Sequence, residues 1–199
     1  MGCGGSKPVA PPVLFFPDPG MPCRAVMNGQ QCRRGAKCTY SHQKTSLVKF
    51  LDELYAARKT LDVCVFTITC NEIAEAIIAA KKRGVKVRVI TDDEQAKCTG
   101  SDVYQIASEG IETRTDSDPI THMHHKFAII DKKTLLNGSF NWTRQAVLGN
   151  RENVIIMRNP ALCDVFTKEF NAQWKLFEKN KVPKNMHQGG GGGQQRNRV

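Results

Sequence analysis

The sequence lacks a long apolar run: the longest candidates, at 61–68 and 85–90, are only long enough for strands. A helix that spans a bilayer needs about 20 apolar residues, so no membrane-spanning helix is expected. The N-terminus also lacks the apolar stretch of a secretory signal peptide. Without such a signal, eight cysteines in 199 residues favour reduced thiols or metal ligation over disulfides.

Acidic residues are nearly absent from both ends of the chain. Residues 1–44 contain six bases and one acid, and residues 179–199 contain five bases and no acid. The stretch 45–178 contains 18 bases and 18 acids, so the net charge of +10 comes from the two ends. This distribution excludes a uniformly basic, histone-like protein. It indicates peripheral attachment to an anionic partner, either phospholipid or nucleic acid.

Hydrophobic residues make up 40% of the chain, which is enough for a core. A short strand is expected at 13–16. The apolar patterns further along predict strands at 61–69, 85–91, 111–114, 126–131, 134–136 and 153–157, and helices at 46–60, 71–84, 102–108 and 160–177. Strands that alternate with helices predict an α/β fold with a mixed β-sheet flanked by helices. We expect one domain at 13–178, between a flexible arm at 1–12 and a disordered, basic, Gly/Gln-rich tail at 179–199.

The first residues, Met1-Gly2-Cys3-Gly4-Gly5-Ser6-Lys7, match the N-myristoylation pattern. Gly2 is the expected acceptor, and Cys3 is a natural palmitoylation site. One acyl chain binds membranes only marginally, and a second chain or a basic patch makes the attachment stable. This N-terminus has both a second acylation site, Cys3, and a basic stretch. The alternative interpretation is a flexible Gly-rich start.

Four residues between positions 20 and 44 have the spacing C-x8-C-x5-C-x3-H: Cys23, Cys32, Cys38 and His42. Three thiolates and an imidazole complete a tetrahedral zinc site with no open position, so a structural zinc is expected. The segment resembles the CCCH zinc fingers that bind single-stranded RNA. That resemblance implies that Tyr40 stacks a base and that Arg33, Arg34 and Lys37 meet phosphates; a finger that only shapes a groove or faces a membrane is the alternative.

The segment 124–131, HHKFAIID, places a base and a cation at the start of a buried strand. Residues two apart in a strand share a face, so His124 and Lys126 point the same way. Ala128 and Ile130 continue that face. His125 is expected on the opposite face, as a structural or solvent-facing residue.

A G-S-x-N pattern follows, formed by Gly138, Ser139 and Asn141. Its tight turn, hydroxyl and amide are all able to hydrogen-bond anionic oxygens. The combination with His124 and Lys126 suits a phosphoester. The imidazole attacks phosphorus, while the Lys, Ser and Asn side chains hold the charged oxygens.

The full spacing, H-x-K-x4-D-x6-G-S-x-N with Asn150-Arg151-Glu152-Asn153 downstream, resembles the phospholipase D superfamily and its HKD motif. The resemblance covers residues 45–178. Within the superfamily, the chain is similar to the small single-motif branch of cardiolipin hydrolases and piRNA-processing endonucleases, which carries a Cys/His insertion after its first strand. It implies the phospholipase D/nuclease fold.

The resemblance also implies roles for the site residues. His124 would be the nucleophile and form a phosphohistidine. Lys126 and Asn141 would bind the phosphate, supported by Ser139. Glu152 would hydrogen-bond the imidazole and fix its tautomer.

Asp131 belongs to the signature, and its expected role is more structural than chemical. No catalytic metal is expected. An H-x-H metal pair formed by His122 and His124 is the alternative, which is weak because no carboxylate or thiol cluster adjoins it in the sequence.

One HKD motif is half of a phospholipase D active site, because a second histidine must protonate the leaving alcohol. No second motif occurs: neither His42 nor His187 is followed by a lysine at the required place. We therefore expect a two-fold symmetric homodimer with a shared site, in which the two copies of His124 act as nucleophile and general acid.

The expected function is a membrane-attached phosphodiesterase that hydrolyses cardiolipin or a related phospholipid to phosphatidic acid. The first alternative is a single-strand RNA endonuclease with the same histidine chemistry. The second is an inactive adaptor that binds RNA or membranes. The resemblance points to the mitochondrial outer membrane, but the relatives are expected to carry a spanning N-terminal helix. The acyl motif would equally suit another cytoplasm-facing membrane.

Overall fold

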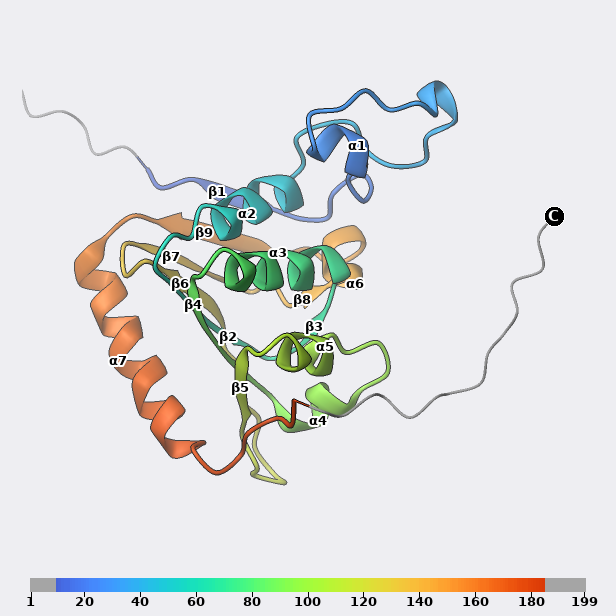
Figure 1. The fold of residues 1–199 in the computed structure, drawn as a ribbon. Helices are drawn as coiled ribbons and strands as arrows, with labels where there is room; N and C mark the ends of the chain where they lie inside the picture. Colours follow the sequence, from blue (N-terminus) through green and yellow to red (C-terminus); the bar gives the residue numbers. More distant parts are fainter. Residues whose placement is uncertain (1–9, 185–199) are drawn as a thin grey trace, which may run out of the picture.

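The computed structural model describes residues 10–184, which form a seven-stranded mixed sheet with helices on both faces (Figure 1). The strand order is β1-β9-β7-β6-β2-β4-β5. These strands are β1 (Val13–Phe15), β2 (Thr60–Val65), β4 (Lys86–Thr91), β5 (Glu112–Thr115), β6 (Lys126–Ile130), β7 (Thr134–Gly138) and β9 (Asn153–Met157). A separate parallel pair is formed by β3 (Ile68–Thr69) and β8 (Trp142–Thr143).

The sheet is parallel on one side of β2 and antiparallel on the other. β2, β4 and β5 are parallel neighbours, whereas β6, β7, β9 and β1 continue from β2 in antiparallel pairs. The helical elements are α1 (Arg24–Met27), the 3-10 turn η1 (Gly35–Lys37), α2 (Ser46–Tyr55), α3 (Asn71–Lys82), α4 (Asp93–Lys97), α5 (Val103–Ser108), α6 (Arg144–Leu148) and α7 (Pro160–Leu176). The predicted mixed α/β architecture is confirmed.

The side chains of β6 alternate between two cores. Ala128 and Ile130 belong to the larger core, together with the buried residues of α2 and α3. Phe127 and Ile129 belong to the smaller core, which α7 covers from the other side of the sheet (Figure 1). Burying a side chain of this size stabilises the fold by about 1.5–3 kcal/mol, so the register of β6 is firmly fixed. His124 lies two residues before Lys126, so by the same alternation it is on the face of Ala128 and Ile130.

The α2 helix is shorter than the sequence predicts. It begins at Ser46, where the side chain of Asp18 accepts hydrogen bonds from the backbone N–H groups of Ser46 (2.9 Å) and Leu47 (2.8 Å). It ends at Tyr55 rather than at 59–60. Thr60 instead begins β2, whose parallel pairing with β4 starts at this residue.

The predicted tail begins later than residue 179. The N–H of Thr115 donates to the carbonyl of Asn180 (3.0 Å), and the N–H of Val182 donates to the carbonyl of Thr113 (2.9 Å). The chain therefore still pairs with the sheet edge at Val182. The rest of the predicted tail, at 185–199, and the acylation motif at Gly2 and Cys3 lie outside the described residues. Between residues 10 and 184, no helix is long and apolar enough to span a bilayer.

Candidate active site and metal centre

Lys126, the first residue of β6, lies directly against His124. Its Nζ is 2.9 Å from Nδ1 and 3.0 Å from Nε2 of the imidazole, and it also donates to the carbonyl oxygen of His124 at 2.8 Å. The expected juxtaposition of base and cation is therefore present. Lys126 pairs with Val65, the last residue of β2. The two side chains therefore lie where the central strand β2 ends and β6 begins.

The ring of Phe66 packs against both His124 and Lys126. Its ring centroid is 4.6 Å from that of His124, and the Nζ of Lys126 lies 5.3 Å from the same centroid. The sequence analysis did not identify Phe66 as a site residue. The available signal was its position directly after the buried β2 strand, because the residue that ends a central strand faces the edge where the site forms.

The surroundings favour the neutral form of the imidazole. Burial lowers the pKa of His124, and the positive charge of Lys126 lowers it further. Burial also lowers the pKa of Lys126, an effect that the carboxylate of Glu152 opposes. A histidine with a pKa below its usual value is unprotonated at neutral pH, and a nucleophilic imidazole requires this state.

Within one subunit, Glu152 bonds Ser139 and Asn150. Its hydrogen bond to an imidazole stays a prediction, because the expected shared site also contains the partner's His124. The Glu152 carboxylate accepts hydrogen bonds from Ser139 Oγ and from the side chain of Asn150, the latter at 3.1 Å. The backbone carbonyl of Asn153 accepts from the N–H of Ser139 (3.1 Å). The carboxylate thus holds Ser139, and it is also near enough to Lys126 to influence the pKa of that lysine. Asn150 is a further supporting residue to which the sequence analysis gave no role.

Position 138, the glycine of the G-S-x-N pattern, has no room for a side chain. A Cβ atom built on Gly138 would lie 2.0 Å from the backbone oxygen of Asn153, where β7 passes β9. Asn141 follows three residues later, and its buried side-chain oxygen has no hydrogen-bond partner in the described part of the chain. Buried polar atoms normally have a partner. This oxygen can accept a hydrogen bond from a donor but cannot bind an anionic phosphate oxygen, so phosphate binding by Asn141 stays a prediction for its NH2 group.

Asp131 lies at the opposite end of β6 from His124 and organises the backbone there. Its carboxylate accepts hydrogen bonds from the backbone N–H groups of Arg58 (3.0 Å), Lys59 (2.7 Å) and Thr60 (2.9 Å). Burial works to raise the pKa of Asp131, but these donors together hold it below its usual value. Asp131 therefore joins the α2–β2 connection to the catalytic strand.

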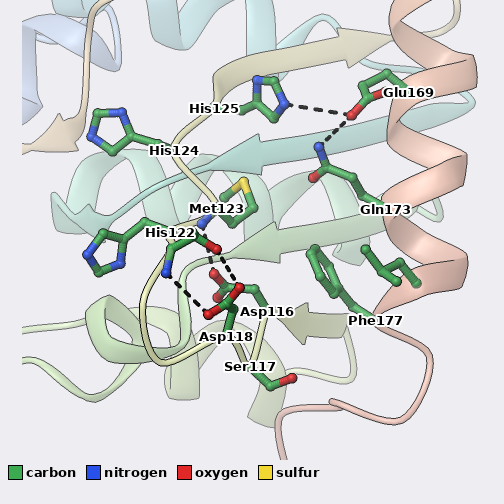
Figure 2. A pocket seen from close by; sticks show the side chains of 12 residues that line it. Asp116, Ser117, Asp118, His122, Met123, His124, His125, Glu169, Gln173 and Phe177 are labelled. Atoms are coloured by element: carbon green, nitrogen blue, oxygen red, sulfur yellow. Dashed lines mark hydrogen bonds and ion pairs between the residues drawn. The ribbon is translucent and has the colours of Figure 1, made fainter.

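A cavity of about 760 Å³ opens between the loop before β6 and helix α7 (Figure 2). His122 and His124 point to one side of this loop, whereas His125 points toward Glu169 of α7, with 3.8 Å between His125 Nε2 and the carboxylate. The predicted opposite orientation of His125 is confirmed. His122 is held by Asp92, whose Oδ2 lies 2.8 Å from the Nδ1 of the ring.

The four predicted metal ligands come together in the insertion after β1. The ligand atoms of Cys23, Cys32, Cys38 and His42 lie within 4.8 Å of one another. Zinc–sulfur bonds are about 2.3 Å long, so a tetrahedral ion fits among them. The backbone N–H of Val26 in particular lowers the pKa of Cys23 to about 7, which favours the thiolate. The other compact group of metal-ligating residue types in the described chain is Asp92, Asp93 and Asp116.

Comparison with known proteins assigns both parts of the chain. Residues 50–174 match the family model of the cardiolipin synthase, PLD-like domain. The chain belongs to the phospholipase D superfamily. Residues 21–43 match the model of the CCCH-type zinc finger. This phospholipase D-type hydrolase therefore has a zinc-finger insertion between β1 and α2, as predicted.

Several relatives share most of the length of this phospholipase D-type chain. A mitochondrial cardiolipin hydrolase of Chlamydomonas reinhardtii is 48% identical over 83% of this chain and 73% of its own length. The protein of that name from Homo sapiens is 37% identical over 87% of this chain and 72% of its own length. Among solved structures, the phospholipase D family member Nuc from Salmonella typhimurium is 32% identical, with a TM-score of 0.62 over 66% of this chain and 88% of that chain.

Proposed function

We propose that this protein hydrolyses cardiolipin to phosphatidic acid through a phosphohistidine on His124. The observation that carries the proposal is the placement of the His124 imidazole 2.9 Å from the ammonium of Lys126, where burial and this cation lower the pKa of the imidazole. The G-S-x-N segment supplies Ser139 and Asn141. A cation and amide and hydroxyl donors suit the developing charge on a phosphodiester. The substrate is proposed from the relatives, which are named mitochondrial cardiolipin hydrolases.

The reaction requires two histidines, and we assign the second to a symmetric homodimer. A nitrogen of His124 forms a bond to phosphorus while the bond from phosphorus to the glycerol oxygen breaks. The partner's His124, in its protonated form, gives its proton to that oxygen. Water then attacks the phosphohistidine and gives a proton back to the partner's His124, and the phosphorus–nitrogen bond breaks. The products of cardiolipin are phosphatidic acid and phosphatidylglycerol.

The finger and the N-terminus complete the proposal. Cys23, Cys32, Cys38 and His42 would hold a structural zinc ion, which supplies folding energy to a segment with little apolar surface. Acylation at Gly2 and Cys3 would attach the protein to a cytoplasm-facing membrane. The relatives are named mitochondrial, so among the cytoplasm-facing membranes we propose the mitochondrial outer membrane.

A second candidate function is cleavage of single-stranded RNA by the same histidine. The observation that favours it is the surface of the finger, where Arg33, Arg34, Lys37 and Tyr40 are exposed. Together they offer cations for phosphates and a ring for base stacking. A cavity of about 640 Å³ beside them is also lined by Arg144, the first residue of α6.

The test supplies purified protein with cardiolipin liposomes or single-stranded RNA, in buffer without added metal. Release of phosphatidic acid supports the first candidate, and release of RNA fragments alone supports the second. His124→Ala should abolish either activity. His125→Ala is the matched control, because it removes the neighbouring imidazole that points toward α7. Full activity of His124→Ala would exclude the proposed mechanism.

A further inference from the structure

The imidazole of His122 lies near that of His124, and the buried side chain of Asp92 fixes its orientation. Asp92 is completely buried, and its Oδ2 lies 2.8 Å from Nδ1 of His122. The other oxygen of Asp92 caps α4 by accepting from the N–H groups of Glu94 (3.1 Å) and Gln95 (2.9 Å). Because Asp92 is held by the helix, it holds the His122 ring in one position and leaves Nε2 exposed.

His122 faces the same side as the nucleophile. The two rings project from the loop in the same direction (Figure 2), and both contact Phe66, with centroid distances of 5.7 Å for His122 and 4.6 Å for His124. The two side chains are also close enough for a charge on His122 to lower the pKa of His124. A substrate group near the scissile phosphate therefore lies within reach of His122.

The surroundings of His122 favour its charged form. The hydrogen bond to Asp92 is the main cause that raises the pKa of His122. Burial opposes it, and the charges of Asp92, Glu94 and Asp116 raise the pKa further, so the net shift is upward. Asp116 itself is occupied, because it accepts from the backbone N–H groups of Asp93 and Met123, both at 2.8 Å. A protonated ring has a hydrogen on both nitrogens, so in that form His122 has an Nε2–H to donate in addition to the bond that Nδ1 makes with Asp92.

We propose that His122, positioned by Asp92, binds a second phosphate of the substrate, next to the phosphate that His124 attacks. This inference rests on the proposed function, since it concerns the same site. Cardiolipin carries two phosphodiesters joined through the three carbons of a glycerol, and RNA carries successive phosphodiesters joined through three sugar carbons. His122 would thus select substrates with two neighbouring phosphates over those with one.

The experiment compares substrates that differ in the second phosphate. Wild type and His122→Gln are assayed on cardiolipin and on phosphatidylglycerol in the same vesicles, and on bis(4-nitrophenyl) phosphate. For RNA, a trinucleotide is compared with a dinucleoside monophosphate. The variant should lose about tenfold or more in kcat/KM on the two-phosphate substrate, the effect of one charge-assisted hydrogen bond. Its rate on single-phosphate substrates should decrease much less, so the ratio of the two rates reports the contribution of the second phosphate.

Two further measurements separate binding from other roles. His122→Lys retains a cation and should keep more of the two-phosphate preference than His122→Gln. The preference of wild type should also decline as the pH rises through the pKa of His122, whereas that of His122→Gln should not change with pH. The side chain of His122 is 46% exposed, but it is the partner of the buried Asp92 carboxylate. Some loss of stability is therefore expected in both variants, and their melting temperatures are measured so that the assays use folded protein.

The outcomes are distinct from those of the proposed function. An equal loss on substrates with one and two phosphates would assign His122 to proton transfer or to the structure of the loop, and would overturn the inference. An unchanged preference in His122→Gln would overturn it as well. If wild type cleaves bis(4-nitrophenyl) phosphate but neither cardiolipin nor RNA, the proposed function itself is wrong, and this inference falls with it.

Discussion

The Nζ of Lys126 lies 2.9 Å from Nδ1 of His124 and 3.0 Å from Nε2, so the charge of the lysine acts directly on the nucleophile. Lys126→Met keeps the length of the side chain and removes this charge. We expect kcat to decrease about 10²–10³-fold, as is typical when a group that stabilises transition-state charge is removed. Initial rates on the preferred substrate measure this change.

The same substitution should alter the pH dependence. Lys126 lowers the pKa of His124, after burial as the first cause, so its removal should raise that pKa. Protonated His124 is not nucleophilic, and the acidic limb of kcat/KM should therefore move to higher pH in Lys126→Met. Lys133→Met, at an exposed lysine beyond β6, serves as the control. If Lys126→Met loses activity with an unmoved acidic limb, Lys126 acts on the substrate and not on His124.

The order of the elements and the face of each β6 side chain were predictable from the sequence, because both follow from local periodicity. The alternation of 124–131 correctly separated His124 from His125. The contacts of Glu152 and His122 were not predictable. The partner of Glu152, Ser139, lies on a different element. The partner of His122, Asp92, is 30 residues away in sequence and is brought close to it by the folding of the sheet.

The shortest strands were misjudged for a related reason: β8 was missed, and β3 was merged into the strand predicted at 61–69. β3 and β8 contain two residues each and exist only because they pair across the fold, so neither has a periodic pattern of its own. The end of α2 was misplaced because Asp131, far along the chain, binds the backbone of 58–60 and draws it into the sheet connection. Local propensity contains no information about that contact.

Asp131→Asn tests the structural role of the HKD aspartate. Asn tolerates the positive φ of 52° at this position, but it accepts the three backbone N–H groups less well than a carboxylate does. We expect the free energy of unfolding at neutral pH to decrease by about 1–3 kcal/mol. Urea titration followed by circular dichroism measures it. Ser139→Ala is a useful contrast, because it should lower activity with little loss of stability.

The sign of the pH effect follows from the low pKa of Asp131 in the folded protein. A depressed folded pKa stabilises the protein above the unfolded value of about 3.9, and the contribution is lost as the pH falls through the folded pKa. The difference between wild type and Asp131→Asn should therefore be constant at neutral pH and shrink in acid. A difference that grows in acid would contradict this account.

Gly138→Ala should damage both stability and the site. The added methyl would meet the backbone oxygen of Asn153 at 2.0 Å, so β7 and β9 must separate. We expect a loss of about 1–3 kcal/mol and reduced kcat, because Ser139 moves with the strand. Gly20→Ala is the matched control, since the nearest atom to its new methyl lies at 3.7 Å. Equal melting temperatures for the two variants would exclude the steric explanation.

Zinc content tests the finger. Purified protein should contain about one zinc ion per chain, and Cys32→Ser should contain almost none. Cys98→Ser changes a cysteine outside the cluster and should retain the metal. Metal removal should increase proteolysis within 20–44 first, because this segment depends on the ion for its folding energy. Protection of that segment in the metal-free protein would show that it folds on its own.

The shared site predicts how mixed dimers behave. If one composite site needs His124 from both subunits, a dimer with one His124→Ala subunit is inactive. Wild type and His124→Ala are refolded together at varying ratios, with the total concentration held above the dissociation constant of the dimer. Activity should then follow the square of the wild-type fraction, so an equal mixture retains about one quarter of the activity. A monomer, or a dimer with two independent sites, would retain about one half. His125→Ala in place of His124→Ala should give an activity that does not follow the square law, because that side chain points toward α7 and is neither nucleophile nor general acid in the proposed reaction.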